Sequence, residues 1–151
     1  MRALIQRVSA GNVSIEGSIC ASIGKGYVIL LGIRKGDTMA DADFLASKCA
    51  GLRVMEDEGG KMNLSLEDVQ GSVIVVSQFT LYGDAQHGNR PSFIDAAAPP
   101  EAEPLYERFV DRMRGLLGAE RVATGVFGAM MEVKILNDGP VTILIESRRS
   151  D

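Results

Sequence analysis

Two buried-strand patterns constrain the fold of this sequence more than any other feature. Tyr27–Ile33 is an almost continuous apolar run after a glycine pair, and Val73–Phe79 begins with four apolar residues soon after Gly71. Both runs have strand length, contain β-branched residues and begin without polar alternation, which is typical of strands buried on both faces. We therefore predict that both are interior strands of a sheet.

The remaining strand patterns lie toward the two ends of the chain. In residues 4–23, apolar residues come in short runs broken at Gly11-Asn12 and Glu16-Gly17, which predicts short strands joined by turns. Near the C-terminus, the alternating residues of Met131–Ile135 and Val141–Ile145 indicate two further strands. We predict that these two strands pair with each other.

Apolar residues spaced three and four apart predict two main helices. The first covers residues 39–51, and the second covers residues 105–117 and ends at Gly118. The proline-containing residues 83–104 are predicted to form a long surface loop. We expect one α+β domain over residues 1–151, in which a mostly antiparallel, barrel-like β-sheet packs with the two helices.

Composition and charge exclude several classes of protein. With 46% hydrophobic and 24% charged residues, the 151-residue chain can bury a core and is neither disordered nor collagen-like. Sixteen Lys and Arg residues against twenty Asp and Glu residues give a net charge of −4. A nucleic acid would therefore have to bind a local basic patch, because the chain has no overall basic field.

Several absent motifs limit the chemistry further. Cys20 and Cys49 lie far apart and outside any metal-binding pattern, so we expect both to be small core residues. The sequence lacks phosphate-loop, dinucleotide-binding and zinc-protease motifs, and we expect no cofactor and no metal. The longest apolar run is far shorter than a membrane span and the start has no signal-peptide pattern, so we expect a cytoplasmic protein.

Polar side chains end the second interior strand. Ser77, Gln78 and Thr80 follow buried apolar residues, at a place where polar groups need hydrogen-bond partners. They fit the floor of a pocket, or alternatively they satisfy the backbone at the strand end. His87, the single histidine of the sequence, can activate a nucleophile here only if the loop delivers it; otherwise it is an exposed loop residue.

An unusual turn separates the last two strand patterns. Asp138-Gly139 alone predicts a two-residue hairpin turn, but Pro140 follows and cannot donate a ladder hydrogen bond. A cis bond is accessible before proline at a cost of about 0.5 to 1 kcal/mol. The segment is either a rigid turn or a stiff loop that aims its carbonyl groups at something.

These two stretches carry a resemblance to a known family. Ser77-Gln78-Phe79-Thr80-Leu81 and Asn137-Asp138-Gly139-Pro140-Val141-Thr142 are similar to the two signature motifs of the D-aminoacyl-tRNA deacylases. The resemblance spans the whole chain and includes four supporting segments: Ala3–Val8, Gly60–Leu64, Arg90–Phe93 and Thr124–Ala129.

The resemblance implies an editing hydrolase that cleaves the ester between a D-amino acid and the terminal adenosine of tRNA. It also implies a homodimer in which Gly139 and Pro140, joined by a cis peptide, complete the partner's site at Ser77–Thr80. Backbone carbonyls there would hold the amino group and collide with an L side chain. Glycine has no side chain to reject, so glycyl-tRNA(Ala) is an expected second substrate. The expected partners are the tRNA acceptor end and a second copy of the chain, with neither DNA nor a membrane.

The resemblance also assigns roles within the site. Ser77, Gln78, Phe79 and Thr80 are the expected catalytic residues, with the tRNA 2′-hydroxyl assisting attack and N–H groups near Phe79 and Thr80 polarising the ester. Phe127 and Met131 match adenosine-binding positions, or alternatively they are core residues. The undifferentiated candidates for phosphate contacts are Arg7, Lys25, Arg34, Lys35, Arg148 and Arg149.

Two other functions compete with this reading. One is a non-catalytic RNA- or nucleotide-binding dimer that keeps the pocket. The other is a small ester hydrolase unrelated to tRNA that uses Thr80 or His87, and indifference to the 2′-hydroxyl would favour it.

Overall fold

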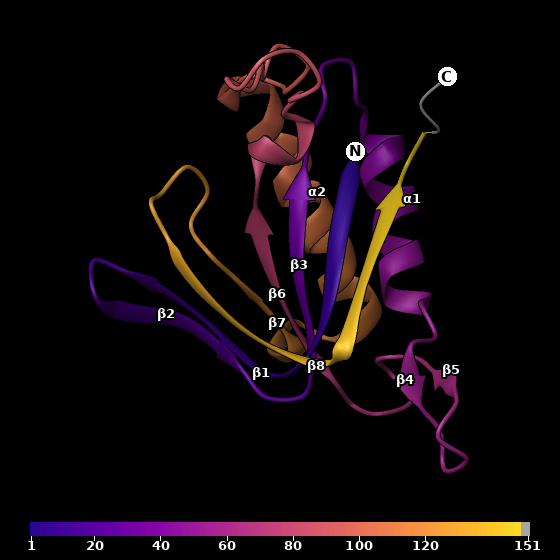
Figure 1. Cartoon of the computed structure of the whole chain (residues 1–151). Coiled ribbons are helices and arrows are strands. Elements are labelled where there is room, and N and C mark those ends of the chain that lie inside the picture. Colours follow the sequence, from indigo (N-terminus) through magenta and orange to yellow (C-terminus); the bar gives the residue numbers. More distant parts are fainter. Residues whose placement is uncertain (149–151) are drawn as a thin grey trace.

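The structure is a computed structural model that describes residues 1–148 (Figure 1). Its strands are β1 (Arg2–Ile15), β2 (Ser18–Ile23), β3 (Gly26–Gly32), β4 (Met55–Glu56), β5 (Met62–Leu64), β6 (Ser72–Ser77), β7 (Val122–Thr124) and β8 (Glu132–Glu146). Its helices are α1 (Met39–Gly51) and α2 (Pro99–Leu117), with the short 3-10 helices η1 (Phe79–Tyr82) and η2 (Ala119–Arg121). Within the described residues, no helix is long and apolar enough to cross a membrane.

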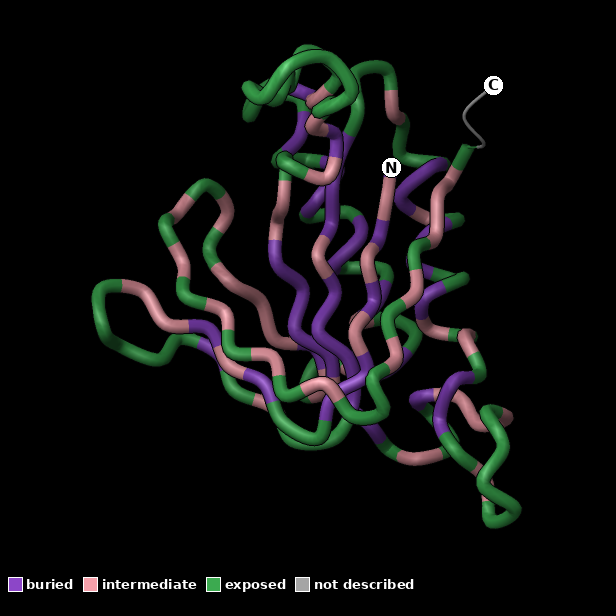
Figure 2. The backbone as a smooth tube through the Cα atoms, in the orientation of Figure 1, coloured by how far each residue is buried: buried purple, intermediate pink, exposed green. Residues whose placement is uncertain are grey.

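The two predicted interior strands form the centre of the main sheet. The strand order is β2-β1-β3-β6-β7, and β8 also pairs with β1. Strand β3 pairs with β6 in parallel, while β1 pairs antiparallel with β2, β3 and β8. Both central strands are almost wholly buried, as the purple stretches of Figure 2 show. The predicted α+β class with a mostly antiparallel sheet is therefore confirmed.

Strand β1 is longer than predicted and makes the sheet barrel-like. The turn predicted at Gly11-Asn12 is wrong, because β1 continues through it to the turn at Glu16-Gly17. A Cβ atom at Gly11 would lie 2.8 Å from a methyl group of Val28, so glycine permits a close crossing there. The second half of β1 and β2 fold back over β6, and a second apolar core forms around Val13 and Ile74.

Strand β8 replaces the two strands predicted near the C-terminus. The prediction that they pair with each other is wrong: both halves of β8 pair antiparallel with β1. Gln6 is opposite Thr142 and Val8 is opposite Asn137, so residues 138–141 bulge out opposite Arg7. Pro140 cannot donate to a ladder, which is consistent with its place in a bulge.

Both helices cover one face of the sheet and lie behind it in Figure 1. Helix α1 has the predicted bounds, whereas α2 begins at Pro99 and not at residue 105, so the predicted loop is shorter. The prediction failed because proline was taken as a breaker: the first helical turn tolerates Pro99 and Pro100, and α2 also continues through Pro104 in its interior. Cys49 of α1 is buried as predicted; Cys20 is exposed because it lies on an outward-facing position of the edge strand β2.

Candidate active site

A cleft of about 740 Å³ opens where β3 and β6 end. Four segments line it: the end of β3, the end of β6 with η1, residues 93–102 at the start of α2, and residues 127–133 before and within β8. Most of the lining is apolar, and Ser77, Gln78 and Thr80 supply polar side chains. The cleft therefore brings the Ser77–Thr80 motif together with Phe127 and Met131, which the sequence separates by about 50 residues.

The Ser77–Thr80 motif marks the change from strand to 3-10 helix. The N–H group of Gln78 donates to the carbonyl of Leu31 at 2.8 Å, which is the last bond linking the motif to β3. The Gln78 side-chain amide donates to the Thr80 hydroxyl oxygen, and both side chains line the cleft. The N–H groups of Phe79 and Thr80 begin η1 and so lack acceptors within that helix. They are available to a ligand oxygen.

Aromatic side chains form two walls of the cleft. The rings of Phe79 and Phe93 meet edge to face at 5.2 Å, and Phe79 is 59% exposed. On the other side, Phe127 packs against Tyr106, with ring centroids 5.6 Å apart. Burial raises the pKa of Tyr106 to about 12, so its hydroxyl stays protonated and donates to the Val75 carbonyl at 3.0 Å. Tyr106 thus ties Phe127 to the central strand.

The two adjacent methionines occupy different environments. Met131 is half-buried against the second apolar core, and Met130 is 91% exposed, although both line the cleft. Met131 is thus the inward-facing residue of the two, in keeping with its alternation with Val133. Tyr106 and Phe93 were missed by the sequence analysis because Tyr106 has an ordinary apolar helix position and Phe93 lies in a loop.

Gly139 and Pro140 do not line this cleft. Their peptide bond is cis, as the resemblance implies, and Gly139 has a φ of +140°, which favours glycine. The Asn137 side chain braces the bulge by accepting from the Val141 N–H group at 2.8 Å. From inside the sheet, Arg7 Nε donates to the Asp138 carbonyl at 2.9 Å and Nη1 donates to the Val54 carbonyl at 2.8 Å.

The bulge and the cleft lie at opposite ends of β3. Arg7, which faces the bulge, is in register with Tyr27 at the start of β3, whereas Ser77 is in register with Leu31 near its end. The four residue steps from Tyr27 to Leu31 span about 13 Å at about 3.3 Å per residue. Within one chain, the structure therefore does not bring the two signature motifs together.

Other candidate groups are absent from the cleft. Among residues 1–148, no carboxylate or histidine side chain lines the cleft, and His87 is exposed in the loop that follows η1. That part of the chain also contains no cluster of three or more His, Cys, Asp or Glu residues suited to a metal ion. The cleft can bind an apolar or aromatic group and polarise an oxygen atom, but it offers no general base from its own lining side chains.

The candidate phosphate ligands differ in accessibility. Arg7 is only 5% exposed and its guanidinium is engaged by carbonyl groups, so the expectation that it contacts phosphate is not supported. Lys25 precedes β3 and lies at the end of the sheet away from the cleft. Arg149 lies outside the described residues. Arg34, Lys35 and Arg148 remain.

A largely apolar cleft with a few convergent polar groups at a strand end is typical of an enzyme's substrate site. The chain belongs to the D-Tyr-tRNA(Tyr) deacylase family, whose sequence model matches residues 4–146. A D-aminoacyl-tRNA deacylase from Symbiobacterium thermophilum is 55% identical over 150 residues and covers 99% of this chain and 98% of that protein. Another from Thermomicrobium roseum is 55% identical and covers 97% of this chain and 94% of that protein.

Solved structures agree with the fold. That of a c-Myc DNA Unwinding Element Binding Protein has a TM-score of 0.94 and 41% identity, and covers 99% of this chain and 100% of that chain. That of a probable eukaryotic D-amino acid tRNA deacylase has a TM-score of 0.83 over 96% of this chain and 98% of that chain. At 17% identity, the second structure bears on the fold alone.

Proposed function

We propose that this protein hydrolyses D-aminoacyl-tRNA in the cytoplasm, releasing the free D-amino acid and reusable tRNA. Membership of the deacylase family supports this reaction, and so does the position of the Ser77–Thr80 motif in a cleft. The cleft binds the aminoacylated terminal adenosine, with Phe127 and Met131 in contact with the nucleoside. Its apolar lining and aromatic walls suit a nucleobase, which stacks on rings and thioether groups.

The site is completed by a second copy of the chain. The observation that carries this step is the separation of the bulge from the cleft: Gly139 and Pro140 lie at the opposite end of β3 and cannot reach their own chain's cleft. Arg7 and Asn137 hold the bulge firmly, as expected of a segment that presents its backbone to a neighbour. In a homodimer, each bulge enters the partner's cleft.

An uncovered sheet face gives the second copy a place to bind. Both helices pack on one face of the sheet, and Leu4 and Leu144 are in register on the other face. Leu144 is 51% exposed. Exposed apolar side chains on a sheet face favour association, and Leu144 lies on β8, the strand that contains the bulge.

Selection between D and L substrates follows from a rigid backbone. Carbonyl groups at Gly139 and Pro140 accept hydrogen bonds from the substrate amino group and leave no room for an L side chain. A D side chain points out of the cleft and makes few contacts with the protein, so many D-amino acids are accepted. Glycine presents no side chain to reject, and glycyl-tRNA(Ala) is therefore a second substrate.

Catalysis relies on the substrate and on backbone donors. The Thr80 hydroxyl accepts a hydrogen bond from Gln78, and within the described residues no carboxylate or imidazole in the cleft activates it. The 2′-hydroxyl of the terminal ribose assists the attack of water on the ester carbonyl, and the N–H groups of Phe79 and Thr80 stabilise the oxyanion. The acyl–oxygen bond breaks, the water oxygen stays on the amino acid, and the ribose hydroxyl is released.

The test compares D-tyrosyl-tRNA and L-tyrosyl-tRNA as substrates of the purified protein. The wild type is expected to cleave the D ester and spare the L ester. A Gly139→Ala/Pro140→Ala variant is expected to lose activity or the distinction between the two esters. If folded, dimeric wild-type protein cleaves neither ester, the editing function is wrong and a non-catalytic RNA-binding dimer replaces it.

A third outcome separates the other hydrolase function. If the protein cleaves simple acyl esters and is indifferent to the 2′-hydroxyl of the substrate, the tRNA assignment fails. Glycyl-tRNA(Ala) is included as a further substrate in the same assay.

A further inference from the structure

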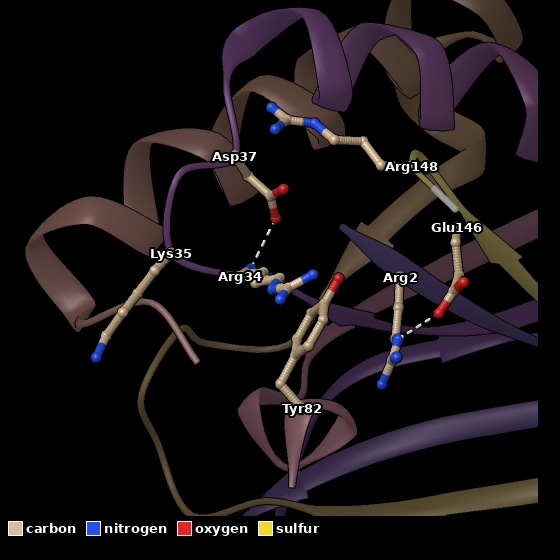
Figure 3. Close-up of a pocket in the computed structure, with 7 residues that line it drawn as sticks. All are labelled: Arg2, Arg34, Lys35, Asp37, Tyr82, Glu146 and Arg148. Carbon is tan, nitrogen blue, oxygen red and sulfur yellow. Dashed lines mark hydrogen bonds and ion pairs between the residues drawn. The ribbon is translucent and has the colours of Figure 1, made fainter. Parts of the chain in front are cut away.

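The structure contains a second, smaller pocket of about 160 Å³, whose lining residues are shown in Figure 3. Four cationic side chains line it: Arg2, Arg34, Lys35 and Arg148. Tyr82 forms one wall, and the Arg2 guanidinium lies over its ring at 4.5 Å from the centroid. Asp37 and Glu146 also line the pocket, so its side chains have mixed charge with an excess of cations.

The two pockets share their dividing wall. Ile33 lines the cleft and the next residue, Arg34, lines the basic pocket. In the same way, Thr80 lines the cleft and Tyr82, two residues further along η1, lines the basic pocket. At about 2.0 Å per residue in a 3-10 helix, these two residues are about 4 Å apart along the axis. The segments that line the two pockets are therefore neighbours in the chain at both places.

The carboxylates around the basic pocket already have partners. Glu146 pairs with Arg2 at 2.5 Å, and Asp37 pairs with the N-terminal ammonium group at 2.9 Å. Arg148 is held by Asp41 at 2.6 Å, and its guanidinium also donates to the Gly36 carbonyl. These pairs fix the walls of the pocket and neutralise most of its charges.

Two cations are left over. Neither the Arg34 nor the Lys35 side chain forms an ion pair with a carboxylate of residues 1–148. Both residues are exposed. Backbone pairing of Arg34 with Ala96, together with the bond from the Lys35 N–H group to the Asp95 carbonyl, fixes this segment beside the cleft. In Figure 3, Arg34 points toward the hydroxyl end of Tyr82, and Lys35 extends away from Arg2 and Glu146.

We infer that the basic pocket binds the phosphate groups of the single-stranded RNA that leads to the terminal adenosine, with Arg34 and Lys35 as the phosphate ligands. This inference rests on the proposed function, because it requires an aminoacylated adenosine in the cleft. A guanidinium binds phosphate through two parallel hydrogen bonds, and an ammonium group binds it as a point charge. Arg7 and Lys25 are excluded by burial and by position.

The test uses two D-tyrosyl esters that differ in phosphate. One is D-tyrosyl-tRNA, and the other is D-tyrosyl adenosine, which carries the same ester and no phosphate. For Arg34→Gln and Lys35→Gln, kcat/KM on the tRNA is expected to fall about fivefold to tenfold, mainly through KM, at about 0.1 M salt. On the adenosine ester, the loss is expected to stay within about twofold.

Salt dependence provides a second readout. Each lost phosphate contact is expected to reduce the slope of log(kcat/KM) against log salt concentration by about 0.7 to 1. Lys25→Gln removes the same charge at the far end of the sheet and serves as the matched control, with no change expected in either assay. Arg34→Lys keeps the charge and is expected to restore part of the activity on tRNA.

The outcomes are distinguishable from failure of the proposed function. If the wild type cleaves neither ester, the proposed function itself is wrong. If the wild type cleaves both esters and the two Gln variants lose activity equally on each, or lose none on tRNA, the phosphate site is wrong. Inorganic phosphate added as a competitor is a further probe. If it inhibits cleavage of neither ester selectively, and if Lys25→Gln lowers activity on tRNA as much as the two Gln variants do, the phosphate contact lies elsewhere and the inference is overturned.

Discussion

Thr80 is the residue whose chemical role the geometry limits most. Its hydroxyl faces the cleft but accepts a hydrogen bond from the Gln78 amide, and no base lines the cleft within the described residues. An unactivated hydroxyl is a weak nucleophile at neutral pH. The backbone N–H groups beside it do not depend on the side chain.

We therefore predict that Thr80→Ala keeps deacylation of D-tyrosyl-tRNA within about tenfold of the wild type, since the oxyanion donors remain. A tRNA that ends in 2′-deoxyadenosine is expected to lose more than about a hundredfold, because the assisting hydroxyl is gone. Single-turnover rates measure both. Complete loss in a folded Thr80→Ala dimer, or a trapped acyl group on Thr80, would point to covalent catalysis instead.

Arg7 is a second single residue with a defined role, because its side chain holds the backbone of the bulge in place. It is buried, and its guanidinium joins the Asp138 carbonyl of the bulge to the Val54 carbonyl of the neighbouring loop. We predict that Arg7→Gln lowers stability by about 1 to 3 kcal/mol and reduces activity on the D ester, because the bulge loses its anchor. Denaturant unfolding and kinetics check the two effects, and Arg53→Gln, on the exposed surface, is the control. Unchanged activity in a destabilised variant would mean that the bulge needs no anchor.

At the scale of elements, the N-terminus of α1 is linked to strand β8 and the residues after it, because Arg148 bonds to Asp41 in the first turn of the helix. Asp41 accepts from the Thr38 N–H group at 2.8 Å and from Arg148, and the Arg148 guanidinium holds the pKa of Asp41 well below its usual range. A carboxyl whose pKa is lowered on folding contributes stability above its unfolded pKa and loses it as the pH falls toward the folded pKa.

Asp41→Asn is therefore predicted to lower stability by about 1 to 2 kcal/mol at neutral pH. The difference from the wild type should shrink as the pH falls below about 4, where the wild-type carboxylate begins to be protonated in the unfolded chain. Thermal unfolding from pH 7 to pH 3 measures this. A difference that stays constant over that range would show that the charge of Asp41 is not what stabilises the cap.

Elements also show how far the sequence alone predicts this fold. Interior strands and α1 were predicted because their signals are local: a continuous apolar run and a spacing of three and four residues. The pairing of β8 was not, because alternation identifies a strand without identifying its partner. The free edge of β1 accepts both halves of β8, so Asp138-Gly139 becomes a bulge and not a hairpin turn.

The candidate site divides in the same way. Polar residues at the end of a buried strand left two interpretations of Ser77–Thr80, a pocket floor or satisfaction of the backbone at the strand end; in the structure the segment lines the cleft. The contribution of residues 93–102 to the cleft could not be predicted, because these residues reach it only through the tertiary packing of α2 and the loop before it. Physical signals in the sequence alone could not distinguish a rigid turn at Gly139-Pro140 from one aimed at a partner.

At the scale of the whole molecule, the sheet face around Leu144 is the proposed contact between two copies. We predict that Leu144→Asp weakens self-association at least about tenfold, since the carboxylate would be buried without a partner. Activity should fall with it and recover at higher protein concentration. Analytical ultracentrifugation with parallel assays checks this, and Leu116→Asp, on an exposed position of α2, is the control. A fully active monomer would contradict the shared site.

Completion of each cleft by the partner's bulge is tested most directly with mixed dimers. One subunit carries Ala129→Trp, which fills the cleft, and the other carries Gly139→Ala/Pro140→Ala; the two bear different tags so that the mixed dimer can be purified. Each homodimer is expected to be defective on D-tyrosyl-tRNA. The mixed dimer has one intact cleft facing one intact bulge, so it should regain about half of the wild-type D-specific activity. A mixed dimer as defective as both parents would mean that the bulge acts within its own chain.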